Sequence, residues 1–166
     1  LNTSAQTIRN DYSALKEKIR THDVIFETKK SYGVRLVGNE IQKRHLFVNV
    51  LLQNISPDNF FDWLKNEKYH PNPFIEYLNN CHCETPLRIL YQKVRSVIHS
   101  RHINISDKEL QEFLLLISIF IKRHPLIEHQ KNILQVNVSL EYQDYEQEFQ
   151  TDILKILNDN FGLTLY

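Results

Sequence analysis

The chain has 166 residues, 42% of them hydrophobic, which is enough for one or two small domains with their own cores. Only three glycines and five prolines among many helix-forming residues indicate a mainly α-helical protein. Twenty basic residues balance twenty acidic ones, but residues 1–46 carry nine Lys/Arg against five Asp/Glu, and the remainder carries eleven against fifteen. A basic head on an acidic body favours a polyanion-binding module joined to a second module.

Cysteine usage argues against a disulfide-stabilised protein, and hydropathy argues against a membrane-spanning one. Cys81 and Cys83 are too few and too close for a disulfide framework, which favours reduced thiols in a cytoplasmic protein. The longest apolar run, Phe113 to Ile121, is less than half of the roughly 20 residues that a spanning helix requires. We therefore expect no membrane partner, and no motif indicates a cofactor.

The first predicted element is a helix that begins behind Ser4, a residue type that caps helix starts. Apolar residues at steps of four, three and four predict one buried stripe, formed by Ile8, Tyr12, Leu15 and Ile19. The polar residues Gln6, Thr7, Arg9, Asn10 and Ser13 then lie on the other faces of this helix.

A basic hairpin follows the first helix. Val24 and Phe26, and later Val34 and Leu36, alternate with polar residues, and Tyr32-Gly33 marks the turn between two strands. The order helix, strand, turn, strand is that of the second half of a winged helix-turn-helix. Because only three residues precede Ser4, we expect the chain to begin inside this domain.

This arrangement predicts a surface for duplex DNA. A polar helix fits the major groove, where Arg pairs with guanine or phosphate and Asn with adenine, and a basic ribbon lies along phosphates. The alternative is an ordinary solvated surface. The predicted DNA-binding residues are Ser4, Gln6, Thr7, Arg9, Asn10 and Ser13 on the helix, and Lys29, Lys30 and Arg35 on the hairpin.

Further helices are predicted along the acidic body. One runs from Glu40 to about Asn54, the next opens at Ser56-Pro57, and Tyr69 to Pro73 forms a connector. Ser106 and Glu109 form a capping box that starts an apolar helix ending before Pro125. Residues 126–140 are ambiguous between strand and loop, and the last helix ends near Gly162.

Residues 4–44 resemble a group of bacterial sugar-operon regulators. The resemblance rests on two motifs, Ser4-x-x-Thr7-Ile8-Arg9-Asn10-Asp11-x-x-x-Leu15 and Gly33-Val34-x-Leu36-Val37-Gly38-Asn39-Glu40-x-x-x-Arg44. These regulators are transcriptional activators with phosphotransferase-system regulation domains (PRD), related to BglG-type antiterminators and Mga-like virulence regulators. The resemblance implies a winged helix-turn-helix at residues 1–40, a helical linker at 41–85, and a PRD-like helical bundle at 86–166 that lacks its last helix.

The resemblance also implies partners. Such regulators are commonly homodimers, and phosphocarrier proteins of the sugar phosphotransferase system phosphorylate a histidine on the core helix of the regulation domain. Here Leu116 stands near the expected position of that histidine, and leucine accepts no phosphate. Phosphorylation of this copy of the domain is therefore not implied.

Other functions are weakly indicated. Cys81-His82-Cys83 lacks the Cys-x-x-Cys spacing of zinc sites, so solvated side chains are the simpler interpretation. No catalytic motif is present, and we expect no enzyme. Two alternatives to DNA binding stay open, namely a winged-helix-like unit that binds protein, and an RNA-binding relative of the antiterminators.

Overall fold

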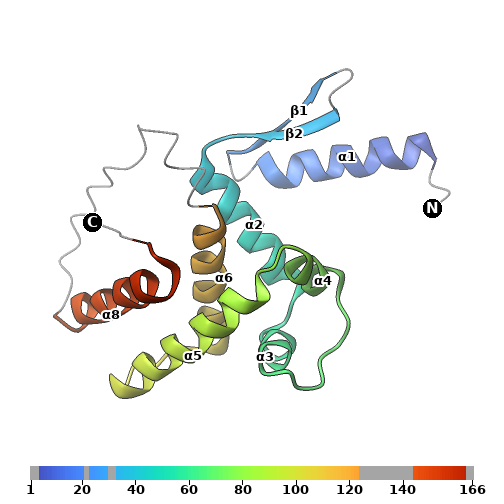
Figure 1. Ribbon diagram of the computed structural model, residues 1–166. Coiled ribbons are helices and arrows are strands. Elements are labelled where there is room, and N and C mark those ends of the chain that lie inside the picture. The colour runs from blue at the N-terminus through green and yellow to red at the C-terminus, as the bar shows by residue number, and fades with distance from the viewer. Residues whose placement is uncertain (1–3, 21–22, 30–32, 124–143, 164–166) are drawn as a thin grey trace. The chain divides into compact units, whose positions relative to one another are not determined.

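The structure is a computed structural model that describes residues 4–20, 23–29, 33–123 and 144–163. In these ranges the chain is mainly α-helical with one two-stranded sheet (Figure 1). Contacts divide it into two compact units, Leu1–Val50 and Leu51–Tyr166, which we call the head and the helical unit. None of the helices described in these ranges is long and apolar enough to cross a bilayer.

The head follows the predicted order of helix, strand, strand and helix. It consists of α1 (Ala5–Arg20), β1 (Ile25–Lys29), β2 (Gly33–Val37) and the first part of α2 (Glu40–Asn54). The strands are antiparallel, with Ile25 opposite Val37 and Lys29 opposite Gly33. Gly33 has a φ of +77°, where a side chain would be strained. Tyr32, the other predicted turn residue, lies outside the described residues.

A small core joins the elements of the head. Ile19 of α1, Val24 before β1 and Leu46 of α2 are buried together, and Phe26 packs against them. Gly38, which links β2 to α2, lies so close to the start of β1 that a Cβ there would be 3.2 Å from the carbonyl oxygen of Asp23. Glycine at this position therefore allows the ribbon and α2 to approach each other.

Side-chain caps begin α2, α3 (Pro57–Lys65) and α6 (Asp107–Arg123), among other helices. The Asn39 side chain accepts the Ile41 N–H (2.8 Å) at the start of α2, and Ser56 accepts the Asn59 N–H (3.4 Å) at the start of α3. Ser106 and Glu109 form the predicted capping box of α6, since the Ser106 N–H donates to Glu109 Oε2 at 2.9 Å. These bonds with the Ser106 side chain and backbone lower the pKa of the Glu109 carboxyl.

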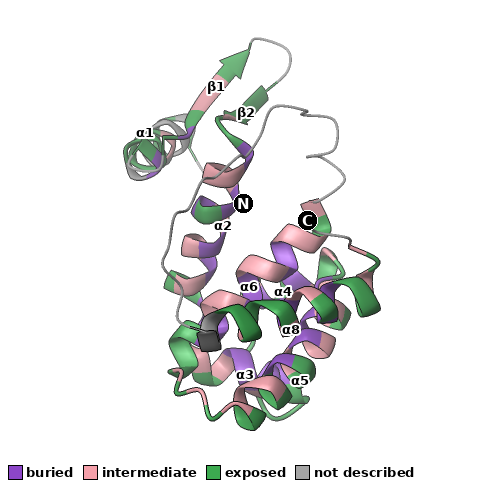
Figure 2. Cartoon of the chain, turned by 90° about the vertical axis from the view of Figure 1, so that its left-hand side faces the viewer, coloured by how far each residue is buried: buried purple, intermediate pink, exposed green. Residues whose placement is uncertain are grey.

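The helical unit is built around α5 (Glu84–Ser100), which packs against α3, α6 and α8 (Asp144–Phe161). The described part of this unit also contains α4 (Pro73–Asn80). Figure 2 shows the buried residues on the inward faces of these helices. Apolar side chains that are at most 2% exposed in this core include Leu51, Ile55, Phe60, Trp63, Ile75, Leu78, Leu87, Leu90, Val94, Leu114 and Leu115.

Two differences from the prediction concern the residues around the predicted connector. The last residue of the predicted connector, Pro73, is the first residue of α4. The Asn72 side chain caps this helix by accepting the Phe74 N–H (2.8 Å), and proline is well suited to the first turn. Helices α3 and α4, predicted as part of a linker, lie within the helical unit. The end of α8 is as predicted, since Gly162 follows it with a φ of +65°. Residues 126–140 lie outside the described residues.

Candidate nucleic-acid interface

The N-terminal turn of α1 is capped as the sequence predicts. The Ser4 hydroxyl accepts the Thr7 backbone N–H at 3.1 Å. The Ser4 and Thr7 hydroxyls also lie 2.8 Å apart and share a hydrogen bond. Both side chains therefore have a structural partner at the start of the helix, which reduces their freedom to turn toward a ligand.

One face of α1 presents amide and hydroxyl groups to solvent. The Gln6 Nε2 group donates to Asn10 Oδ1 at 3.0 Å, one helical turn apart, and both residues are exposed. Ser13, three residues further, is also exposed and lies on the same side of the helix. The structure thus brings together three of the predicted DNA-binding residues.

The opposite side of α1 packs on the ribbon. The Tyr12 ring lies 5.7 Å from the Phe26 ring, and the Tyr12 hydroxyl forms a 2.6 Å hydrogen bond with the Thr28 hydroxyl. Ile19 completes this side of the helix and is 4% exposed. Because the ribbon contacts this side, the face carrying Gln6 and Asn10 remains open.

The prediction that Leu15 belongs to the buried stripe is wrong. Leu15 is 46% exposed, whereas Ile19 on the same stripe is buried. Leu15 is three residues from Tyr12, so it lies about 60° around the helix from the residue that contacts the ribbon. The contacts of α1 with β1 and with the small core involve Tyr12 and Ile19 and leave this flank exposed.

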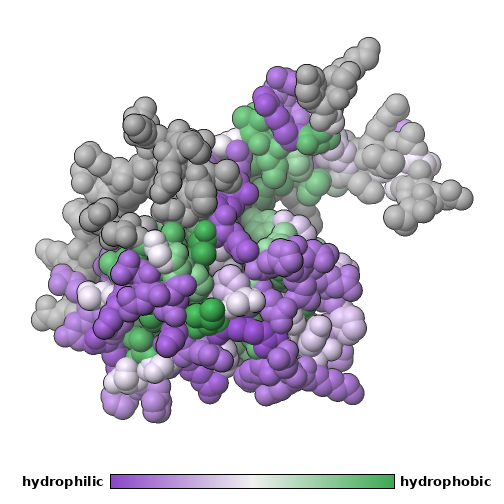
Figure 3. Space-filling view, in the orientation of Figure 1, coloured by the Kyte–Doolittle hydropathy of each residue, from purple (hydrophilic) through white to green (hydrophobic). Residues whose placement is uncertain are grey.

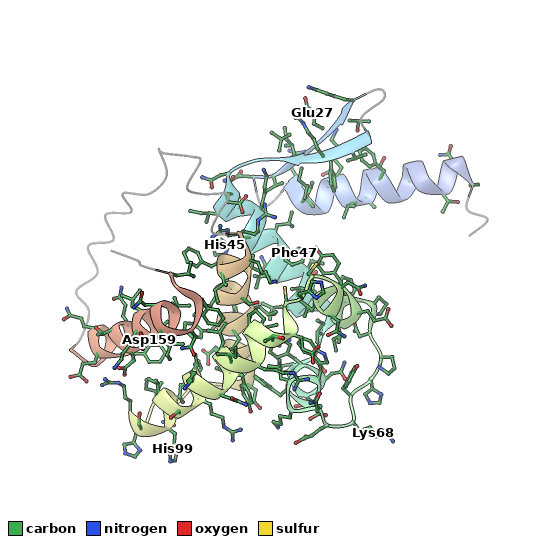
Figure 4. The ribbon with its side chains drawn as sticks, in the orientation of Figure 1. Glu27, His45, Phe47, Lys68, His99 and Asp159 are labelled. Atoms are coloured by element: carbon green, nitrogen blue, oxygen red, sulfur yellow. The ribbon has the colours of Figure 1, made fainter. Side chains whose placement is uncertain are left out.

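The charged residues of the ribbon are clustered around Glu27, which Figure 4 shows on the strand. Glu27 lies directly opposite Arg35 in the strand register, and its carboxylate binds the Arg35 guanidinium. Lys29 Nζ also lies 4.0 Å from the Glu27 carboxylate. The cluster carries one net positive charge, and its Lys29 and Arg35 side chains are half exposed or more, at 54% and 62%.

Two predicted contacts cannot be placed by the structure. Lys30 lies outside the described residues. Arg9 is part of α1, but its side chain is among those not described.

Sequence reasoning missed the residues that position the predicted interface. Thr28 and Glu27 are not among the predicted site residues, yet Thr28 binds α1 through Tyr12 and Glu27 neutralises part of the basic charge. The Glu27–Arg35 pairing follows from a strand register that the turn length alone does not determine. Lys16 and Arg20 of α1 are both exposed, and Arg20 forms an ion pair with Glu17 at 3.8 Å.

The residues behind the family resemblance have structural roles in the head. Arg44 Nε donates to Glu40 Oε1 at 3.2 Å, and both side chains are at least 90% buried. Burying an ion pair requires such mutual satisfaction, since a lone buried charge is strongly destabilising. Gly38 packs against Val24 just before α2, and Glu40 pairs with Arg44 inside α2. These contacts explain why glycine, glutamate and arginine occupy their positions in the Gly-x-Glu-x-x-x-Arg pattern.

No protein-family model, curated protein or solved structure matches this chain. The family resemblance of residues 4–44 therefore stays a prediction.

The cysteine segment shows no metal-site geometry in the described ranges, where no three His, Cys, Asp or Glu side chains gather as ligands. Cys81 and Cys83 flank the turn between α4 and α5, and both are free thiols. The Cys83 thiol donates to the Cys81 carbonyl oxygen at 3.8 Å. Burial raises the pKa of the Cys83 thiol. A hydrogen bond with Cys81, followed by burial, raises the pKa of Tyr77.

We expect Cys83 to react with Ellman's reagent roughly tenfold or more slowly than Cys81 at pH 8, because the attacking species is an accessible thiolate. The Cys81→Ser and Cys83→Ser proteins each retain one thiol and allow the two rates to be measured separately. Because the folded-state pKa of Cys83 is raised, its contribution to stability is present at neutral pH and decreases as the pH rises above about 8.5. Equal rates in the folded variants would contradict the assigned burial.

Proposed function

We propose that the head binds duplex DNA, with α1 in the major groove and the β1–β2 ribbon against adjacent phosphates. The main support is that α1 has one packed side and one exposed polar side. Tyr12 and Ile19 hold one side on the ribbon and the small core, while Gln6, Asn10 and Ser13 form an exposed polar face on the other. An α-helix fits the major groove, and amide side chains complement base edges there.

The proposal also assigns a specific fold to each of the two units. The head is the second half of a winged helix-turn-helix, supported by its order of helix, two-stranded ribbon and capped α2. Residues 86–166 of the helical unit are a PRD-like bundle that mediates homodimerisation and regulation, supported by the sequence resemblance and by the buried apolar core of this unit. A dimer would place two heads on half-sites separated by about one turn of DNA.

In this proposal the protein regulates transcription of a bacterial sugar-utilisation or virulence operon in the cytoplasm. Phosphocarrier proteins of the sugar phosphotransferase system are partners of the family that residues 4–44 resemble. Leu116, in α6, stands near the place of the family's phosphorylated histidine, so regulation through phosphorylation is not part of the proposal for this site.

The proposal is tested by fluorescence anisotropy with a random duplex across a salt series. We expect affinity to fall linearly with salt on a log–log plot, and the Lys29→Ala protein to lose about 0.9 from that slope, as for one phosphate contact. Lys93→Ala, which changes an exposed lysine of the helical unit, is the matched control and should bind like wild type.

Three outcomes are informative. Failure of the folded wild-type protein to bind DNA at low salt would reject the proposal. Equal effects of Lys29→Ala and Lys93→Ala would place the phosphate contacts outside the ribbon. Preferential competition by a hairpin RNA over duplex DNA would favour the RNA-binding alternative.

A protein-binding head is the second candidate, and the apolar surface of the ribbon favours it. Val34 and Leu36 of β2 are 52% and 40% exposed, on the strand face that includes Phe26 and Thr28, and Leu15 is exposed on α1. Figure 3 shows hydrophobic surface along the ribbon. Monomeric proteins rarely expose contiguous apolar patches that have no binding role. Absence of DNA binding combined with salt-insensitive self-association or partner binding would favour this candidate.

A further inference from the structure

The proposed DNA-reading face contains two side-chain amides that are hydrogen-bonded to each other. Gln6 Nε2 donates to Asn10 Oδ1 at 3.0 Å, and both side chains are exposed on the side of α1 away from the Tyr12 contacts. By contrast, the Thr7 hydroxyl is engaged with Ser4. Gln6 and Asn10 therefore orient each other, and both residues are exposed to solvent.

The bond leaves the recognition chemistry of Asn10 intact. A carbonyl oxygen has two acceptor positions, and the bond from Gln6 occupies one of them, so Oδ1 can accept a second hydrogen bond. The Nδ2 group keeps two N–H donors. Asn10 therefore presents one acceptor and one donor side by side. The bond to Gln6 also favours one of the two flipped orientations of this amide.

That donor–acceptor pattern fits adenine. In the major groove adenine offers an N–H donor at N6 beside an acceptor at N7, which an amide satisfies with two hydrogen bonds. Guanine offers two acceptors, O6 and N7, and so cannot use the amide oxygen. An oriented amide thus discriminates between these bases by chemistry alone.

We infer that Gln6 and Asn10 act as one unit that reads an A·T base pair, with Asn10 contacting adenine and Gln6 serving as its positioning residue. The inference rests on the proposed function of the head and adds the base that this face selects. Contacts to phosphate supply affinity without sequence information, so the two properties can be measured separately.

The test is selection of bound sequences from a random duplex pool, followed by affinity measurements on the selected site. For wild type we expect an adenine at one selected position, and replacing it should weaken binding by about 5- to 160-fold, the range for one bidentate contact. Asn10→Ala should abolish the preference at that position. Gln6→Leu should reduce the preference there while leaving the salt dependence as in wild type.

Gln92→Leu is the matched control, since it makes the same chemical change on an exposed position of α5. It should leave the selected sequence unchanged, and thermal unfolding of all variants should match wild type. If the Gln6→Leu and Asn10→Ala proteins bind DNA and select the same sequence as wild type, the inference is overturned while DNA binding stands. If wild type binds no DNA at low salt, the proposed function fails and the inference fails with it.

Discussion

Replacing Arg88 by methionine is expected to lower the free energy of unfolding of the helical unit by about 2–4 kcal/mol, because two helix-terminal carbonyls lose a charged donor. The Arg88 guanidinium donates to the backbone oxygens of Trp63 (2.9 Å) and Leu64 at the end of α3. It also donates to the side chain of Asn66 (2.6 Å), the residue that caps this helix end. Methionine keeps much of the apolar stem and removes only the polar head.

Urea unfolding followed by tryptophan fluorescence measures this effect directly. Trp63 is the sole tryptophan of the chain and is 2% exposed, so its emission reports on the helical unit alone. Arg95→Met is the matched control on the same helix. Arg95 is exposed and contacts Tyr91, one turn away on the same helix, through its hydroxyl (2.8 Å) and ring. A loss of stability in Arg95→Met as large as that in Arg88→Met would contradict the capping role.

Arg88 illustrates a contact that sequence alone does not reveal. Its position four residues after Glu84 predicts an exposed ion pair along one helix, and that pair is present, with Nε at 3.0 Å from the Glu84 carboxylate. The bonds to α3 depend on how α5 packs against α3, which is a tertiary feature. Local spacing therefore predicts the weaker of the two interactions.

Local signals predicted the boundaries of most elements. Ser4, Ser56 and Ser106 each accept the expected backbone N–H, and Gly162 follows α8 with positive φ. These devices act within three or four residues, so the sequence contains the information needed. Helix α4 was missed because Pro73 was read as a helix breaker, although a proline preceded by a capping Asn72 equally begins a helix.

The candidate site was predictable in part for the same reason. Helical spacing predicted that Gln6, Asn10 and Ser13 lie away from the apolar stripe, and in the structure all three are exposed within three turns of one helix. The exposure of Leu15 and the pairing of Arg35 with Glu27 depend on the width and register of the ribbon. Periodicity describes which face a residue occupies, but it does not tell how much of that face another element covers.

The apolar run in α6 shows this limit most sharply and leads to a second large expected effect. From Phe113 to Ile121 almost every residue is apolar, so the pattern does not indicate which of them are central. In the structure Leu114 is 0% exposed, whereas Leu116 is only half-buried. Leu114→Ala should therefore lower the free energy of unfolding by about 2–5 kcal/mol, through lost apolar contacts and an unfilled cavity.

Leu116→Ala removes the same atoms from the same helix and is the matched control. Because a half-buried site exposes part of the side chain and lets solvent fill the space, we expect Leu116→Ala to cost less than half as much as Leu114→Ala. The measurement is again urea unfolding followed by Trp63 fluorescence, on α3, which packs against α6. Equal losses would mean that both leucines are enclosed to the same degree.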